Sequence, residues 1–215
     1  MMMSDKVHFE VLPEAQKKVL HQLGPIVDQD GFYLGGGTAI ALQLGHRRSI
    51  DFDWFTDQLF DNPHQYSGNL GDRGLTWQLQ QAAPGTLHGT VDGVKVSFLS
   101  YQYPRIEDLV GISGHSCTMA SLLDLGCMKL AAVAQHGSRK DFIDIWALAH
   151  HGLGLGEMLA SYRKKYATDD IAHLLMALSY FDDAELEPMP VMLIDVAWVD
   201  IKEAIRRLVK DFASA

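Results

Sequence analysis

Cysteine, long hydrophobic runs and positive charges are all scarce in this sequence. The two cysteines, Cys117 and Cys127, are too few for a disulfide framework, which predicts a reducing, cytoplasmic setting. No run of about 18 apolar residues is present, so we expect no membrane span. Residues 1–6 lack an apolar core and a small-residue cleavage site, so we expect no secretion signal.

Acidic residues outnumber basic ones, which narrows the range of partners. The chain has 27 Asp and Glu residues against 18 Lys and Arg, for a net charge of −9. Such a chain does not suit general binding of nucleic acid, although a local basic patch can hold one, and acidic clusters suit divalent cations. With 215 residues, 47% of them hydrophobic, it is long enough for one domain with a real core, which excludes a disordered, collagen-like or disulfide-stapled chain.

Strand and helix signals mix in the first half of the chain, whereas the second half is helical. Asp92-Gly93 separates two β-branched runs and predicts a tight hairpin, while Gly24-Pro25 and Gly45 predict helix ends. We expect an α+β fold, with a mixed sheet and helices over residues 1–104 and a helical region over 105–215 that shares the same cleft. The expected strands are 31–34, 49–54, 77–80, 87–91 and 94–99; the expected helices are 12–23, 38–44, 121–136, 138–150, 157–166, 169–181 and 197–212; and 56–75 is expected to be a loop or short helix.

Asp51 and Asp53 lie two residues apart in a segment whose polar and apolar residues alternate. On a strand, both carboxylates would point to one face, roughly 6.6 Å apart, while Ile50, Phe52 and Trp54 anchor the other face. Two carboxylates at this spacing can share one Mg²⁺ or bridge two. A solvated polar face is the alternative for an isolated pair.

Gly35-Gly36-Gly37 follows a short apolar run and precedes a helical one. Glycines let backbone N–H groups approach a phosphate closely, and a helix N-terminus favours an anion. Thr38 can cap this helix or bind a phosphate oxygen. A plain tight turn is the alternative. If the turn and the carboxylate pair converge, they form the adjoining phosphate and metal sites that a nucleoside triphosphate with Mg²⁺ requires.

These residues match a known pattern. Gly36-Gly37-Thr38 followed by Asp51-Phe52-Asp53 resembles the Gly-Gly-[Ser/Thr]…Asp-x-Asp signature of the DNA polymerase beta-like nucleotidyltransferases. The fuller stretches 32–42 and 45–55 are similar to the AbiEii/AbiGii toxin branch, as are a lysine block at 124–132 and an [Arg/Lys]-Asp-x-x-Asp block at 139–144. The resemblance covers roughly residues 12–150.

The resemblance implies a minimal nucleotidyltransferase core that transfers a nucleoside monophosphate from a nucleoside triphosphate (NTP) to an acceptor hydroxyl. Relatives in this branch serve as toxins of type IV toxin–antitoxin or abortive-infection systems, with a separate antitoxin protein, and some act on transfer RNA. We therefore expect Mg²⁺ or Mn²⁺ as cofactor, an NTP as substrate, an RNA such as tRNA or a protein as acceptor, and an antitoxin as a partner.

The resemblance also assigns roles to individual residues. Asp51 and Asp53 are the candidate metal ligands and catalytic residues. Two further catalytic candidates are Lys129, which would offset phosphate charge, and Asp141, which would orient the substrate. The candidates for binding the triphosphate are Gly36, Gly37, Thr38, Arg47, Arg48 and Arg139.

Each of the charged candidates has a simpler alternative. Ser138 and Asp141 have capping-box spacing, and Asp141 flanks an apolar helical stripe, so it can border a cleft. Asp144 is spaced for a surface ion pair with Lys140. Lys129 beside an apolar stripe can simply extend its ammonium to water, and the arginines can be solvated.

One position departs from the superfamily pattern. A third metal-binding carboxylate commonly comes from a later strand, where the best candidate position here is Ser97, a poor Mg²⁺ ligand. Asp92 lies in the predicted turn and is not expected to reach the site. The alternative to an active enzyme is therefore a catalytically weakened or inactive member that binds nucleotide or a partner protein. A glycosyltransferase, which can also use an Asp-x-Asp pair, would not need the lysine block or the 139–144 block.

Overall fold

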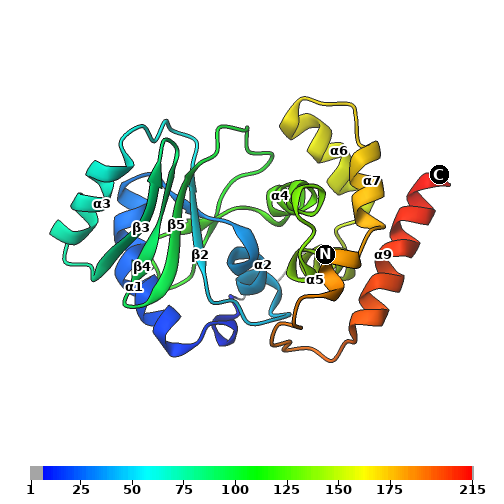
Figure 1. Ribbon diagram of the computed structural model, residues 1–215, viewed down its shortest axis with the longest axis horizontal. Coiled ribbons are helices and arrows are strands. Elements are labelled where there is room, and N and C mark those ends of the chain that lie inside the picture. Colours follow the sequence, from blue (N-terminus) through cyan, green and yellow to red (C-terminus); the bar gives the residue numbers. More distant parts are fainter. Residues whose placement is uncertain (1–6, 215) are drawn as a thin grey trace.

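A mixed seven-stranded sheet forms one part of the computed structural model, which describes residues 7–214 (Figure 1). The strand order is β3-β4-β5-β2-β1-β7-β6. β2 runs parallel to β5 and β1 runs parallel to β7, whereas the remaining neighbours are antiparallel. The strands are β1 (Tyr33–Leu34), β2 (Phe52–Thr56), β3 (Trp77–Ala83), β4 (Thr86–Val91), β5 (Val94–Ser100), β6 (Val110–Gly111) and β7 (Thr118–Met119).

Helices flank this sheet and build the rest of the molecule, which confirms the α+β class and the helical second half. In Figure 1, α1 and α3 lie with strands β3–β5, α2 lies in the middle, and α6, α7 and α9 lie at the far end. α2 contacts β2 as well as α4 and α5, so it joins the two parts. The helices are the 3₁₀ turn η1 (Phe9–Val11), α1 (Glu14–Gln29), α2 (Gly36–Leu44), α3 (Pro63–Asp72), α4 (Leu122–Gln135), α5 (Arg139–His150), α6 (Leu155–Tyr166), α7 (Ala172–Leu178), α8 (Asp182–Glu185) and α9 (Trp198–Ala213).

The predicted alternation is confirmed from Phe52 onward, but the strand begins there, and Ile50, which was expected to anchor the buried face, is 58% exposed. Phe52, Trp54 and Thr56 are buried, and Asp53 and Phe55 between them are partly exposed. Burying an aromatic side chain of this size contributes about 1.5–3 kcal/mol. The apolar face of β2 therefore fixes the strand, and with it the face from which Asp53 projects.

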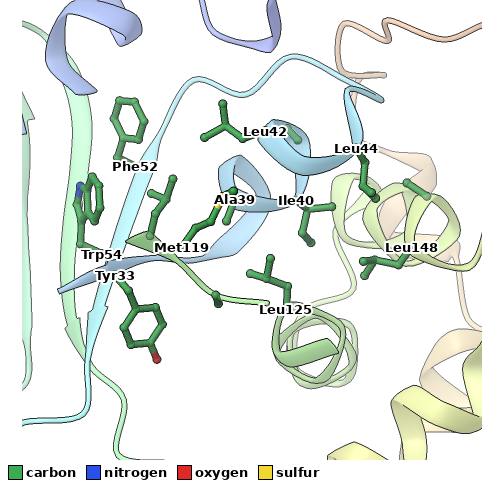
Figure 2. Packing of buried hydrophobic residues seen from close by; sticks show 14 of the residues in the cluster. Tyr33, Ala39, Ile40, Leu42, Leu44, Phe52, Trp54, Met119, Leu125 and Leu148 are labelled. Atoms are coloured by element: carbon green, nitrogen blue, oxygen red, sulfur yellow. The ribbon is translucent and has the colours of Figure 1, made fainter. Parts of the chain in front are cut away.

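One hydrophobic core extends through both parts of the chain. Figure 2 shows Ile40 of α2 on the side of Leu125 of α4 and Leu148 of α5, and all three are buried. β7 also adds to the sheet beyond β1, where Leu34 pairs with Met119. The sheet thus continues past residue 104, the boundary expected from sequence.

Two helix ends differ from the predictions. α1 runs through Pro25 to Gln29, although Gly24-Pro25 predicted a stop. A proline inside a helix costs about 3 kcal/mol, but continuing the helix buries Val27 completely. The single helix expected at 169–181 is divided into α7 and α8, and Phe181 between them packs 4.7 Å from the Phe142 ring.

The turn predictions are confirmed. Asp92 and Gly93 both have positive φ, 48° and 79°, as a two-residue hairpin turn between β4 and β5 requires. Gly45, with φ of 68°, ends α2 in the left-handed conformation. Within residues 7–214, the helices are all too short or too polar to cross a lipid bilayer. The expectation concerning residues 1–6 falls outside the described part of the chain.

Candidate active site

The glycine turn and the Asp51/Asp53 pair meet in one cavity of about 840 Å³. Gly35, the residue before α2, donates its N–H to the Asp53 carbonyl oxygen at 2.8 Å. Gly36 has φ of +62°, and a Cβ placed there would lie 2.8 Å from Asp53 Oδ2. Only glycine therefore lets the turn approach the carboxylate so closely. This contact brings together the two motifs that the sequence separates.

Thr38 does not cap α2, which was one of its two predicted roles, and its binding of a phosphate oxygen stays a prediction. It lies inside the first turn of α2, because Gly35 takes the capping position. Its buried hydroxyl is 2.6 Å from Ser49 Oγ and bonds to the Asp51 carbonyl oxygen. Thr38 therefore ties the helix start to the chain that enters β2, and it lines the cavity while doing so.

Asp51 and Asp53 both line the cavity. Asp53 belongs to β2, and Asp51 is the residue just before that strand. Burial raises the pKa of the Asp53 carboxyl above its usual value, and the charge of Asp51 adds to that effect. The Ser97 hydroxyl and the Lys129 ammonium act in the opposite direction but do not cancel it. Burial thus disfavours the ionised form of Asp53, and a cation placed beside the two carboxylates would favour it.

A buried cluster of charged residues, which we call the Asp144 cluster, stands behind this pair: Asp144, Asp141, Lys129, Arg47 and His46. Asp144 is fully buried and accepts bonds from Arg47 Nε (2.7 Å), Arg47 Nη2 (2.8 Å) and His46 Nε2 (2.8 Å). Burial acts to raise the pKa of Asp144, but Arg47 and then Lys129 hold it well below its usual value. The alternative of a surface ion pair with Lys140 is therefore wrong.

Lys129 is the second cation of the cluster. Its Nζ lies 2.7 Å from Asp141 Oδ1 and 2.9 Å from Asp144 Oδ2, and the residue is only 7% exposed. Burial acts to lower the pKa of Lys129, but the two carboxylates raise it by more. Lys129 is thus a buried, paired lysine that lines the cavity, and not one extended into water.

Asp141 faces both the cluster and the cavity. Ser138, which precedes α5, donates its hydroxyl to Asp141 Oδ2 at 2.5 Å and caps no backbone N–H, so the predicted capping box does not form. Burial acts to raise the pKa of Asp141, but Lys129 and Ser138 bring it below its ordinary value. Asp141 therefore holds the lysine in place at the edge of the cavity.

His46 is the remaining member of the Asp144 cluster. Burial lowers its pKa and keeps the ring neutral, so Nε2 carries the proton given to Asp144. Its Nδ1 is buried with no hydrogen-bond partner in the described residues. With His46 neutral, the charges of two aspartates, one lysine and one arginine cancel.

The three candidate arginines lie in different environments. Arg47 is bound to Asp144 as described, while Arg48 is exposed and lines the cavity. Arg139 is directed to α8, where it donates to the carbonyl oxygens of Ala184 (2.8 Å) and Glu185 (3.0 Å). It thus anchors α8, so its predicted contact with phosphate does not fit this geometry.

Several cavity residues were missed by sequence reasoning. Lys140, the neighbour of Arg139, lines the cavity as an exposed cation. A segment before α9, residues 187–191, lines it through Glu187, Met189, Pro190 and Val191. The only sequence signal for this segment is its two prolines, which predict an extended chain.

Ser97 occupies the position predicted for a third carboxylate. In the parallel pairing of β2 and β5 it stands directly opposite Asp53. Its hydroxyl oxygen lies 3.0 Å from His88 Nδ1 on β4. Asp92 stays in the hairpin turn and pairs with Lys18 at 2.9 Å, as expected of a residue outside the site. Over residues 7–214, no group of three or more His, Cys, Asp and Glu side chains is arranged to hold a metal ion.

The fold is that of a nucleotidyltransferase. MenT4, a nucleotidyltransferase toxin from Mycobacterium tuberculosis, superposes with a TM-score of 0.58 at 13% identity, over 94% of this chain and 82% of MenT4. JHP933 from Helicobacter pylori gives 0.58 at 16% identity over 94% of both chains. The antibiotic-resistance factor ANT(2'')-Ia gives 0.55 at 15% identity, over 71% of this chain and 94% of that factor.

Within this fold, the sequence defines a narrower group. The uncharacterized protein aq_aa25 from Aquifex aeolicus (strain VF5) is 35% identical over 204 residues, which span 94% of this chain and 97% of that protein. The chain therefore belongs to the same family as aq_aa25. No family model matches the chain.

Proposed function

We propose that this protein is a nucleotidyltransferase that uses Mg²⁺ or Mn²⁺ to move a nucleoside monophosphate from an NTP to an acceptor hydroxyl. The observation that carries this proposal is the contact between Gly36 and Asp53, with Asp51 in the same cavity. A glycine turn that contacts one carboxylate, with a second carboxylate in the same cavity, is the arrangement that an NTP with a divalent cation needs.

The residues present fit a divalent cation held by two carboxylates. Asp51 and Asp53 provide hard oxygen ligands in one cavity. Burial, and to a smaller extent the charge of Asp51, raises the pKa of Asp53, and a bound divalent cation would favour its ionised form. Water would complete the coordination, because the position opposite Asp53 is Ser97. A bound Mg²⁺ or Mn²⁺ would neutralise phosphate charge and polarise the reacting phosphoryl group.

In this proposal the triphosphate binds to the turn and to two cations that form no ion pair within residues 7–214. The N–H groups at Gly36 and Gly37 begin α2 and suit phosphate oxygens. Lys140 and Arg48 line the cavity and offset phosphate charge. Lys129 and Arg47 are already paired with carboxylates, so in this proposal they position Asp141 and the start of α2.

The transfer is an in-line displacement at phosphorus. The acceptor oxygen forms a bond to the α-phosphorus, the bond from the α-phosphorus to the bridging β-oxygen breaks, and pyrophosphate leaves. The proton of the acceptor hydroxyl passes to water. The side chains described above bind and orient the two substrates, which lowers the entropic part of the barrier.

The cellular role that we propose is the toxin-like component of a type IV toxin–antitoxin or abortive-infection system, in the cytoplasm. This is supported by the sequence resemblance to the AbiEii/AbiGii branch and by the fold shared with MenT4, which is a nucleotidyltransferase toxin. An RNA such as tRNA, or a protein hydroxyl, would be the acceptor, and a separate antitoxin would be the partner.

A second candidate is a catalytically weakened or inactive member that only binds nucleotide or a partner protein. The observation that favours it is Ser97, which stands opposite Asp53 in place of a carboxylate. This candidate predicts NTP binding without release of pyrophosphate.

The test is incubation of the protein with each α-labelled NTP, Mg²⁺, and total RNA or total protein. We expect labelled acceptor with the native chain and none with Asp51→Asn or Asp53→Asn. The matched control is Asp72→Asn, which removes an exposed carboxylate at the end of α3. Mn²⁺ binding, followed by electron paramagnetic resonance, should be lost in the same two variants, and labelling that survives in Asp51→Asn would refute the proposal.

A further inference from the structure

A short segment before α9, residues 187–191, forms one wall of the cavity, and we call it the strap. At its start, Glu187 Oε2 accepts the backbone N–H of Arg139 at 2.9 Å. At its end, the carbonyl oxygen of Val191 accepts the N–H of Arg48 at 2.8 Å. The strap is therefore bound at both ends to elements that also line the cavity.

The chain just after the strap reinforces this attachment. Met192 forms an isolated antiparallel bridge with Arg47, and the N–H of Leu193 donates to the His46 carbonyl oxygen at 3.0 Å. His46 and Arg47 belong to the Asp144 cluster. The strap is thus held against the rigid, buried part of the site and is suited to contact a ligand reproducibly.

The strap changes the chemical character of the cavity. Met189, Pro190 and Val191 present apolar surface, and Ile50 adds to it from the chain before β2. Ile50 and Val191 are 58% and 59% exposed although they line a cavity. Phosphates require the glycine turn and the cations, so the apolar surface suits a different part of the ligand. A nucleobase is the flat, mostly apolar part of an NTP.

Glu187 adds a polar group to this wall. With Oε2 bonded to Arg139, its Oε1 has no hydrogen-bond partner in the described part of the chain, and the residue lines the cavity. A carboxylate repels phosphate and accepts hydrogen bonds from N–H groups. Adenine, cytosine and guanine each carry an exocyclic amino group, whereas the edge of uracil places two carbonyl oxygens beside its N–H.

We propose that the strap is the nucleobase-binding wall of this site and that Glu187 favours NTPs whose base carries an amino group over UTP. This inference rests on the nucleotidyltransferase function proposed above. The strap belongs to the second half of the chain, and Glu187 lies outside the resemblance at 12–150.

The test is isothermal titration of the full chain with ATP, CTP, GTP, UTP and inorganic tripolyphosphate, each with Mg²⁺. We expect at least one amino-bearing NTP to bind about tenfold more tightly than UTP, the effect of one hydrogen bond to a charged group. Glu187→Gln should reduce that preference to about twofold without weakening the binding of tripolyphosphate. Glu203→Gln, which changes an exposed glutamate of α9, should leave all affinities unchanged.

A second variant tests the apolar wall. Met189→Ala should weaken the binding of all four NTPs by about tenfold and leave the affinity for tripolyphosphate unchanged, because it removes only contact with the base. If all NTPs bind the native chain as weakly as tripolyphosphate, the base-binding wall is refuted while the phosphate site stands. If neither tripolyphosphate nor any NTP binds, the proposed function itself fails.

Discussion

The Nζ atom of Lys129 lies 2.9 Å from Oδ2 of the fully buried Asp144. The same carboxylate receives two hydrogen bonds from Arg47, so three elements, α4, α5 and the chain after α2, are joined through one side chain. Breaking a buried charge pair leaves partners unpaired in a low-dielectric interior, which costs more than the pair contributed.

Asp144→Asn should therefore lower the free energy of unfolding by about 3–5 kcal/mol. The amide keeps the shape of the side chain but leaves Arg47 and Lys129 without their full counter-charge. Urea denaturation followed by circular dichroism measures the change. Asp211→Asn, an exposed position on α9, is the control and should change stability by less than about 0.5 kcal/mol. A similar small change for Asp144→Asn would contradict a structural role for the cluster.

The Asp144 cluster also predicts that the stability of the fold depends on pH. The pKa values of Asp141 and Asp144 lie below their ordinary values, so the folded state prefers both groups ionised. Their contribution to stability is present above the ordinary carboxyl pKa and is lost as the pH falls through the lower, folded values. Thermal melting between pH 7 and pH 2.5 should show stability falling below about pH 4. Asp141→Asn should make that fall shallower, and an unchanged slope would count against this explanation.

Gly36→Ala and Gly93→Ala form a matched pair. Both glycines have positive φ, 62° and 79°, so each alanine should cost about 1–2 kcal/mol of stability. Only at Gly36 would the new methyl group meet Asp53, because nothing lies within 4 Å at Gly93. Gly36→Ala should therefore weaken Mn²⁺ binding by about tenfold or more, and Gly93→Ala should not. Equal Mn²⁺ affinity in the two variants would show that the turn does not position the carboxylate.

Ser97→Asp tests whether the missing carboxylate limits metal binding and transfer activity. The new carboxylate would face Asp53 across the β2–β5 pair and add a third oxygen ligand. Mn²⁺ should bind about tenfold more tightly, whereas Ser97→Asn should bind no more tightly than the native chain. Transfer that arises only in Ser97→Asp would identify the native chain as a weakened member. Transfer in the native chain would show that two carboxylates suffice.

Lys140→Ala and Arg139→Ala separate two neighbouring cations. Lys140 faces the cavity, so its loss should weaken tripolyphosphate binding by about tenfold with little effect on stability. Arg139 bonds to α8 and lies over the Trp198 ring at 5.0 Å, so its loss should cost about 1–3 kcal/mol of stability and leave tripolyphosphate affinity unchanged. The reverse pattern would restore Arg139 as a phosphate ligand.

Features that depend on local chain geometry were predictable from the sequence. The alternation around Asp53 follows from the strand period, and the hairpin at Asp92-Gly93 follows from the two residues that tolerate positive φ. The convergence of the glycine turn and Asp53 could be expected because a nine-residue helix connects antiparallel neighbours, β1 and β2.

Features that depend on partners distant in sequence were not predictable. The i, i+4 rule suggested Lys140 as the partner of Asp144, but its partners include His46 and Arg47, about a hundred residues away. The end of the strap lies further still in sequence from Arg48, whose N–H donates to Val191, and a single sequence carries no signal for such pairing. Pro25 shows the same limit, because tertiary burial of Val27 outweighs the local tendency to end the helix.

The sheet order has a consequence for how such a protein can change over time. β7, from the second half of the chain, pairs with β1 from the first half, and the strap lines a cavity that residues of the first half also line. Each half therefore depends on the other to complete the sheet and the cavity. Recombination between relatives at a mid-chain junction would have to preserve the pairing of β1 with β7 and the contacts of the strap at once. With the base-binding role that we propose for the strap, new specificities are more easily reached by substitutions in residues 187–191 than by exchange of half chains.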